Sequence, residues 1–78
     1  MSLKAQIRNH ATWPKFKPVW QEAVRQSNEM GPIRRDAAFA HFLGGCSAEL
    51  QSSGTISRRK LVQLLNNATE FGRNTKIL

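Results

Sequence analysis

Apolar residues recur every three or four positions through most of this 78-residue chain, and no segment alternates between apolar and polar residues. Such spacing is typical of helices that bury one side, whereas strands need alternation. The pattern therefore predicts an all-α fold. The clearest segment carries Phe39, Phe42, Leu43, Cys46 and Leu50.

Glycine, proline and serine divide the pattern into three main helices. Gly31-Pro32 ends one helix and starts the next, because glycine favours helix C-termini and proline the first turn. Ser52–Thr55 is a turn by composition. We expect a compact bundle of helices over about 18–30, 32–51 and 57–71.

The segment from Pro32 is predicted to be the central helix, because it is apolar all round. Its second face is lined by Ile33, Ala37, Ala40 and Gly44. Gly44-Gly45 is a weak point, since each glycine inside a helix costs roughly 1 kcal/mol relative to alanine. Either these glycines end the helix or, as we prefer, it continues to about Gln51.

The two ends of the chain are less constrained. Residues 2–11 form either a short amphipathic helix or part of a disordered arm over 1–12, and the tail 73–78 is expected to fray. Two prolines within Thr12–Pro18 favour an extended connector, with Pro18 in the first turn of the helix that follows.

The last helix is expected to bury one stripe and to stop at Gly72, with Thr55 or Ser57 as its N-cap. The stripe comprises Leu61, Leu64, Leu65, Ala68 and Phe71. A single domain of this size has a small core, so a homodimer is a further option. No signal peptide or membrane span is visible, and Cys46 stands alone, which together favour a cytoplasmic protein.

Catalysis finds little support, and we expect no enzyme, cofactor or metal. His41 and Cys46 are five residues apart, so on one helix they point in different directions. Glu22 and Glu29 could share a helix face, which solvation alone explains. No other cluster of acids, bases or thiols has the spacing of a catalytic or metal site.

The strongest functional signal is the stretch Ser57-Arg58-Arg59-Lys60 at the expected start of a helix. The first turn exposes unpaired N–H groups and the positive end of the helix dipole, so cations there are unfavourable unless an anion binds. Arg34-Arg35 repeats the pattern after Gly31-Pro32, although Asp36 partly compensates. With 12 Lys and Arg against five Asp and Glu, the chain's net charge of +7 also favours an anionic partner.

Aromatic and cationic residues interleave in the segment WPKFKPVW. Trp13, Phe16 and Trp20 could stack on bases of a single strand while Lys15 and Lys17 follow its phosphates. A small domain also needs its largest side chains in the core. We prefer the core interpretation for both tryptophans.

Together these features predict a small, basic, non-enzymatic nucleic-acid-binding or regulatory protein. Its anion contacts are expected from Arg58, Arg59 and Lys60, with Arg34, Arg35, Lys15 and Lys17 as secondary contacts. A start of this kind is also compatible with the second helix of a helix-turn-helix unit. The alternative is a modulator that docks on an acidic protein surface.

Overall fold

The protein is an all-α bundle, as the apolar spacing predicted. In the computed structural model, which describes residues 2–76, four helices and no strand are present. None of the described helices has the length and apolar character needed to cross a membrane. The helices are α1 (Leu3–Arg8), α2 (Trp13–Glu29), α3 (Pro32–Ser53) and α4 (Arg58–Arg73).

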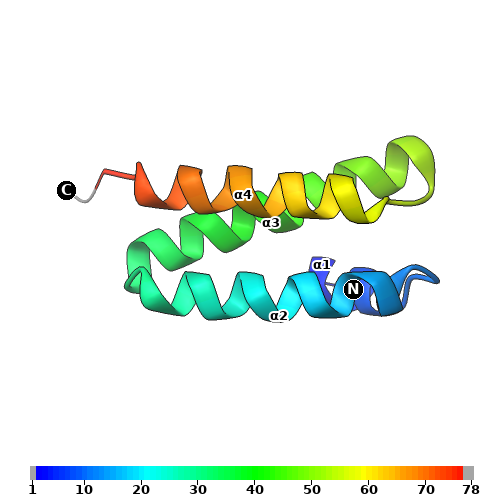
Figure 1. Ribbon diagram of the computed structural model, residues 1–78, viewed down its shortest axis with the longest axis horizontal. Helices are drawn as coiled ribbons and strands as arrows, with labels where there is room; N and C mark the ends of the chain where they lie inside the picture. The colour runs from blue at the N-terminus through cyan, green and yellow to red at the C-terminus, as the bar shows by residue number, and fades with distance from the viewer. Residues whose placement is uncertain (1, 77–78) are drawn as a thin grey trace.

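The three long helices run along the 38 Å axis of the molecule (Figure 1). Helices α2 and α4 run in the same direction, and α3 runs in the opposite direction and crosses α4. The starts of α2 and α4 therefore lie at one end of the bundle, together with the end of α3. The start of α3 lies at the other end. Helix α1 packs against α3.

The core is shared by all four helices and by one loop residue. Its fully buried side chains are Phe16, Phe42, Ile7, Ile56, Leu61 and Cys46. Ile7 anchors α1, so the short N-terminal helix is present. Ile56 fixes the loop between α3 and α4. Sequence spacing alone did not identify Ile56 as a core residue, because it lies outside any helical repeat.

The expected extended connector over Thr12–Pro18 is wrong, because α2 begins at Trp13 and continues through Pro18. Pro14 lies in the first turn, where its missing N–H group is harmless. Pro18 removes one hydrogen bond from the helix interior. The helical course nevertheless buries Phe16 completely and places it on the same side as Val19 and Trp20. Burial of these large side chains outweighs the local preference of proline.

Helix α3 is continuous through Gly44-Gly45 and extends two residues beyond the expected Gln51. Gly45 lies close to α4, since a Cβ atom there would lie 2.8 Å from Cδ2 of Leu64 and this side chain would have to shift. Gly44 meets no such neighbour. Gly54 ends α3 with a φ of 73°, in the left-handed region that glycine favours. The second face of α3 stays open, and Ile33 is 54% exposed.

Helix α4 extends to Arg73, and its buried stripe differs from the expected one at the C-terminal end. Gly72 is buried and Phe71 is 48% exposed. Gly72 continues the helical repeat of three and four residues set by Leu61, Leu65 and Ala68. Phe71 is one residue earlier, so it points about 100° away from the buried side of the helix. Phe71 instead stacks on the exposed His41 ring, with centroids 4.4 Å apart. The expected burial of Phe71 was therefore wrong.

Candidate anion-binding end of the bundle

The first turn of α4 contains three consecutive cations, Arg58, Arg59 and Lys60. Ser57 caps the helix, because its Oγ accepts a hydrogen bond from the Lys60 N–H at 3.2 Å. Arg58 and Arg59 are exposed and Lys60 is half-buried. None of the three forms an ion pair with a described residue, and this first turn contains no acid. Their positive charge is thus uncompensated locally.

The parallel course of α2 and α4 brings Lys15 to the same place. The Thr69 hydroxyl of α4 lies 2.7 Å from Oε1 of Gln26 in α2, which sets the register of the two helices. Eleven residues before these two positions are Arg58 and Lys15. Eleven residues are about three helical turns, so Lys15 lies on the same side of α2 as Gln26, and Arg58 lies on the same side of α4 as Thr69. These are the sides on which the two helices face each other. The two cations therefore lie at the same level on neighbouring helices at this end.

Lys17 lies at the same end but on the other side of α2, because two residues rotate a helix position by about 200°. We call Lys15, Lys17, Arg58, Arg59 and Lys60 the basic end. The N-termini of α2 and α4 both lie here, and neither first turn contains an acid. The positive ends of two helix dipoles add to the five side-chain charges.

The remaining two candidate residues lie elsewhere. Arg34 and Arg35 belong to the first turn of α3, at the opposite end of the long axis (Figure 1). The Arg35 guanidinium is 3.7 Å from the carboxylate of Asp36, so its charge is partly compensated. Arg34 is half-buried, with its Nε enclosed and without a hydrogen-bond partner among the described residues. The seven cations chosen from the sequence thus form no single surface.

Two acidic residues of α2 lie beyond its first turn and pair with an arginine, whereas Glu49 lies in the last turns of α3, at the same end of the bundle as the basic end. Arg25 bridges Glu22 and Glu29 on the surface of α2, with its Nη1 2.7 Å from Oε1 of Glu29. Hydrogen bonds from Arg25 and Gln26 lower the pKa of Glu22 to about 2. Two of the five acids are therefore committed to one arginine and do not offset the basic end.

The aromatic residues of the WPKFKPVW segment belong mainly to the core. Trp20 is 5% exposed, and its ring meets those of Trp13 and Phe39 edge to face at 5.7 and 5.1 Å. The Arg8 guanidinium of α1 lies 5.8 Å from the Trp20 ring, within the range of a cation–π contact. Phe16 is fully buried. The rings of Phe16 and Trp20 are therefore not available as a stacking platform for single-stranded bases, and Trp13 is half-buried against them.

Tryptophan fluorescence checks this arrangement. We expect blue-shifted emission that acrylamide quenches poorly, because Trp20 is enclosed and Trp13 is packed against it. Nucleic acid should change the emission little. Red-shifted, easily quenched emission that becomes protected when single-stranded DNA is added would contradict the burial and move the binding surface to the start of α2.

The possible reactive residues do not come together. Cys46 is completely buried, and this burial raises the pKa of its thiol to about 12, which disfavours the reactive thiolate. His41 is exposed on the other side of α3 and stacks on Phe71. Within residues 2–76, no three His, Cys, Asp or Glu side chains are grouped closely enough to hold a metal ion.

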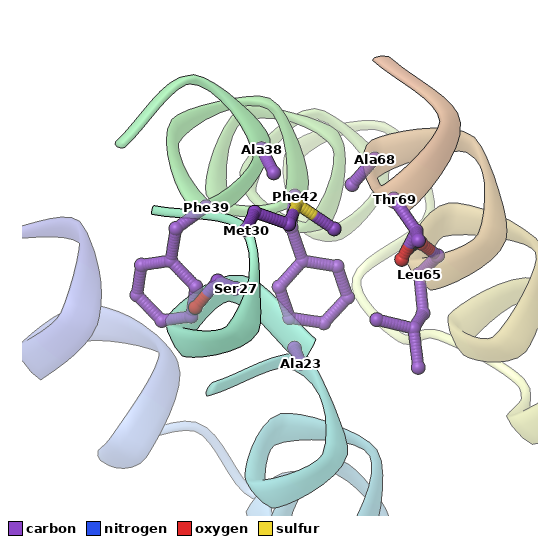
Figure 2. Close-up of a pocket in the computed structure, with 9 residues that line it drawn as sticks. All are labelled: Ala23, Ser27, Met30, Ala38, Phe39, Phe42, Leu65, Ala68 and Thr69. Carbon is purple, nitrogen blue, oxygen red and sulfur yellow. Dashed lines mark hydrogen bonds between the residues drawn. The ribbon is translucent and has the colours of Figure 1, made fainter. Parts of the chain in front are cut away.

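A small cavity lies where α2, α3 and α4 meet (Figure 2). Its volume is about 10 Å³, close to the minimum for a single water molecule. The hydroxyls of Ser27 and Thr69 reach its wall, but each lies 2.9 Å from a carbonyl oxygen of its own helix, at Val24 and Leu65. The cavity is a packing defect between helices and too small for a ligand.

No known protein family, curated protein or solved structure matches this chain. The function is therefore inferred from its own residues. All members of the basic end can be recognised in the sequence as candidate contacts. Their grouping cannot, because the position of Lys15 relative to Arg58 depends on the register of α2 against α4. Lys15 precedes Gln26 by eleven residues, and Arg58 precedes Thr69 by the same number. This equal spacing places the two cations at one level only because Gln26 and Thr69 are in contact.

Proposed function

We propose that this protein binds nucleic acid through the basic end and that it does so without catalysing a reaction. The supporting observation is the convergence of two helix N-termini with five cations, none of which is paired with a described acid. Phosphate groups satisfy both features, since they accept hydrogen bonds from first-turn N–H groups and neutralise Lys and Arg. A cytoplasmic regulatory role accords with this proposal.

The expected mechanism is electrostatic. Arg58 and Arg59 offer planar guanidinium groups suited to two-pronged phosphate contacts, while Lys15, Lys17 and Lys60 act as point charges. Each phosphate that they neutralise releases condensed counterions, so the affinity falls as salt rises, with a slope of about −0.9 in log–log form per contact on duplex DNA. The dipoles of α2 and α4 add to this attraction at the same end.

Fluorescence anisotropy with labelled duplex and single-stranded probes tests the proposal. We expect binding at about 50 mM salt that weakens steeply at higher salt. The double change Arg58→Glu with Arg59→Glu should abolish most of this binding and reduce the salt slope by about 2, since two phosphate contacts are lost. The fold should persist, because acids suit the first turn of a helix. Circular dichroism and thermal melting measure that second part.

The matched control is Arg34→Glu with Arg35→Glu at the opposite end of the bundle. It makes the same change in net charge in the first turn of another helix. We expect this variant to keep most of the affinity. Equal losses in the two folded variants would mean that net charge, rather than the basic end, determines binding. An absence of binding to any nucleic acid at low salt would favour the alternative, a modulator that docks on an acidic protein.

A further inference from the structure

The outer face of α4 carries a polar stripe that the bundle does not use. Intervals of four, three, four and three residues separate its members, all of which are exposed. Helical periodicity therefore aligns them along one side of α4. The α4 stripe comprises Arg59, Gln63, Asn66, Glu70 and Arg73, with Asn67 beside it.

The amide groups of the stripe have no role in the fold. The side chains of Gln63, Asn66 and Asn67 make no hydrogen bond to any residue in the described part of the chain. Asparagine is a poor helix former, and here two adjacent asparagines occupy the middle of a 16-residue helix. Their presence disfavours the helix, and no contact within the bundle compensates for it.

The stripe also differs in charge from an ordinary exposed helix face. Solvated helices commonly alternate acids and bases that pair at intervals of three or four residues, as Glu22, Arg25 and Glu29 do on α2. The α4 stripe has an arginine near each end, amides between them and Glu70 as its one acid. Arginine, glutamine and asparagine are the side chains that recognise base edges most directly.

We propose that α4 lies in the major groove of duplex DNA and that Gln63, Asn66 and Asn67 contact base edges there. This inference rests on the proposed function and specifies the polyanion. An amide side chain matches adenine, because it donates to N7 and accepts from the N6 amino group. Glu70 fits the same role by accepting from the amino group of cytosine.

The dimensions of α4 suit this groove. From Arg59 to Arg73 the stripe is about 21 Å long, at 1.5 Å per residue, whereas the major groove is about 12 Å wide. A helix that crosses the groove thus brings its terminal arginines to the phosphates on the two walls and its amides over the base edges. Arg58 and Lys15, beside the first turn, add phosphate contacts at one wall.

Duplex DNA fits the stripe better than the other polyanions. In duplex RNA the major groove is deep and narrow, so side chains on a helix do not reach the base edges. Single strands are bound largely by base stacking, and the rings of Phe16 and Trp20 are buried. An acidic protein surface would be matched by cations alone and would leave the amides unexplained.

The test is a selection from short DNA duplexes randomised at their centre, followed by affinity measurements on the selected site and a scrambled one. The wild-type protein should enrich a defined motif. The change Asn66→Ala with Asn67→Ala should weaken binding to that motif about 10- to 100-fold, as expected for the loss of amide–base pairs. Its affinity for the scrambled duplex should stay the same, because the phosphate contacts remain. Alanine favours the helix, so the variant should remain folded.

Gln21→Ala with Asn28→Ala is the matched control, since these exposed amides lie on α2. It should keep the full preference for the selected site. Three results would overturn the inference while leaving the proposed function intact: salt-dependent binding without an enriched motif, an unchanged preference in the Asn66/Asn67 variant, or equal affinity for duplex RNA of the selected sequence. Failure to bind any nucleic acid would instead reject the proposed function itself.

Discussion

Replacing Phe42 by alanine is expected to unfold most of the protein at room temperature. Phe42 is 1% exposed and touches the aromatic cluster of α2 and α3, with its ring 6.3 Å from that of Trp20. Truncating a buried phenylalanine costs about 3–5 kcal/mol. A bundle of this size rarely has more than about 3–5 kcal/mol of stability in total. Urea unfolding followed by circular dichroism measures the change.

Phe71→Ala is the control for this prediction, because it removes the same side chain from an exposed site. Phe71 packs on one face of His41 and is 48% exposed. Its loss should lower the free energy of unfolding by less than about 1 kcal/mol, as is usual for surface positions. Similar unfolding curves for the two variants would show that the assigned register of α3 is wrong.

Gly72→Ala should have the second largest effect on stability. A Cβ atom at this position would lie 2.5 Å from Cβ of Ala38 and 3.1 Å from the carbonyl oxygen of Arg34. Neither atom moves unless the backbone of α3 moves, so α3 and α4 must separate. Overpacking of this kind costs about 1–3 kcal/mol. We expect the melting temperature to fall by about 10 °C, from the usual relation between stability and melting in small domains.

Gly44→Ala is the matched control, since it makes the same substitution in an exposed part of α3. A Cβ atom there has no neighbour within 4 Å. Alanine should therefore stabilise the helix by up to about 1 kcal/mol and raise the melting temperature by about 4–8 °C. If Gly72→Ala melted at or above the wild-type temperature, the close approach of α3 and α4 at Gly72 would be incorrect.

The helix boundaries illustrate where sequence patterns are reliable. Gly31 and Gly54 mark the ends of α2 and α3 because a chain reversal needs the conformations that glycine allows, which is a local property. Pro18 misled the prediction for the opposite reason. Its local preference opposed a helix, but the burial of Phe16 and Trp20, which depends on the rest of the bundle, outweighed that preference.

In the candidate site, too, local features could be predicted from the sequence and features that depend on the rest of the bundle could not. Sequence alone identified the cationic first turn of α4, because a helix start and its missing acids can be recognised from neighbouring residues. It did not separate Arg34 and Arg35 from Lys15, since α3 runs opposite to α2 and carries its first turn to the far end of the bundle. It also did not assign the α4 stripe, because polar residues become a surface only when the buried side of the helix is known.

By itself, the sequence determined the all-α class, the three long helices and the excess of positive charge, since these depend on local spacing and composition. Only the tertiary structure decided which cations lie at the same end of the bundle. The contact between Gln26 and Thr69 aligns two parallel helices that lie far apart in the chain, and this alignment places Lys15 at the same level as Arg58. Such a register depends on side-chain packing between distant segments, so no local sequence pattern specifies it.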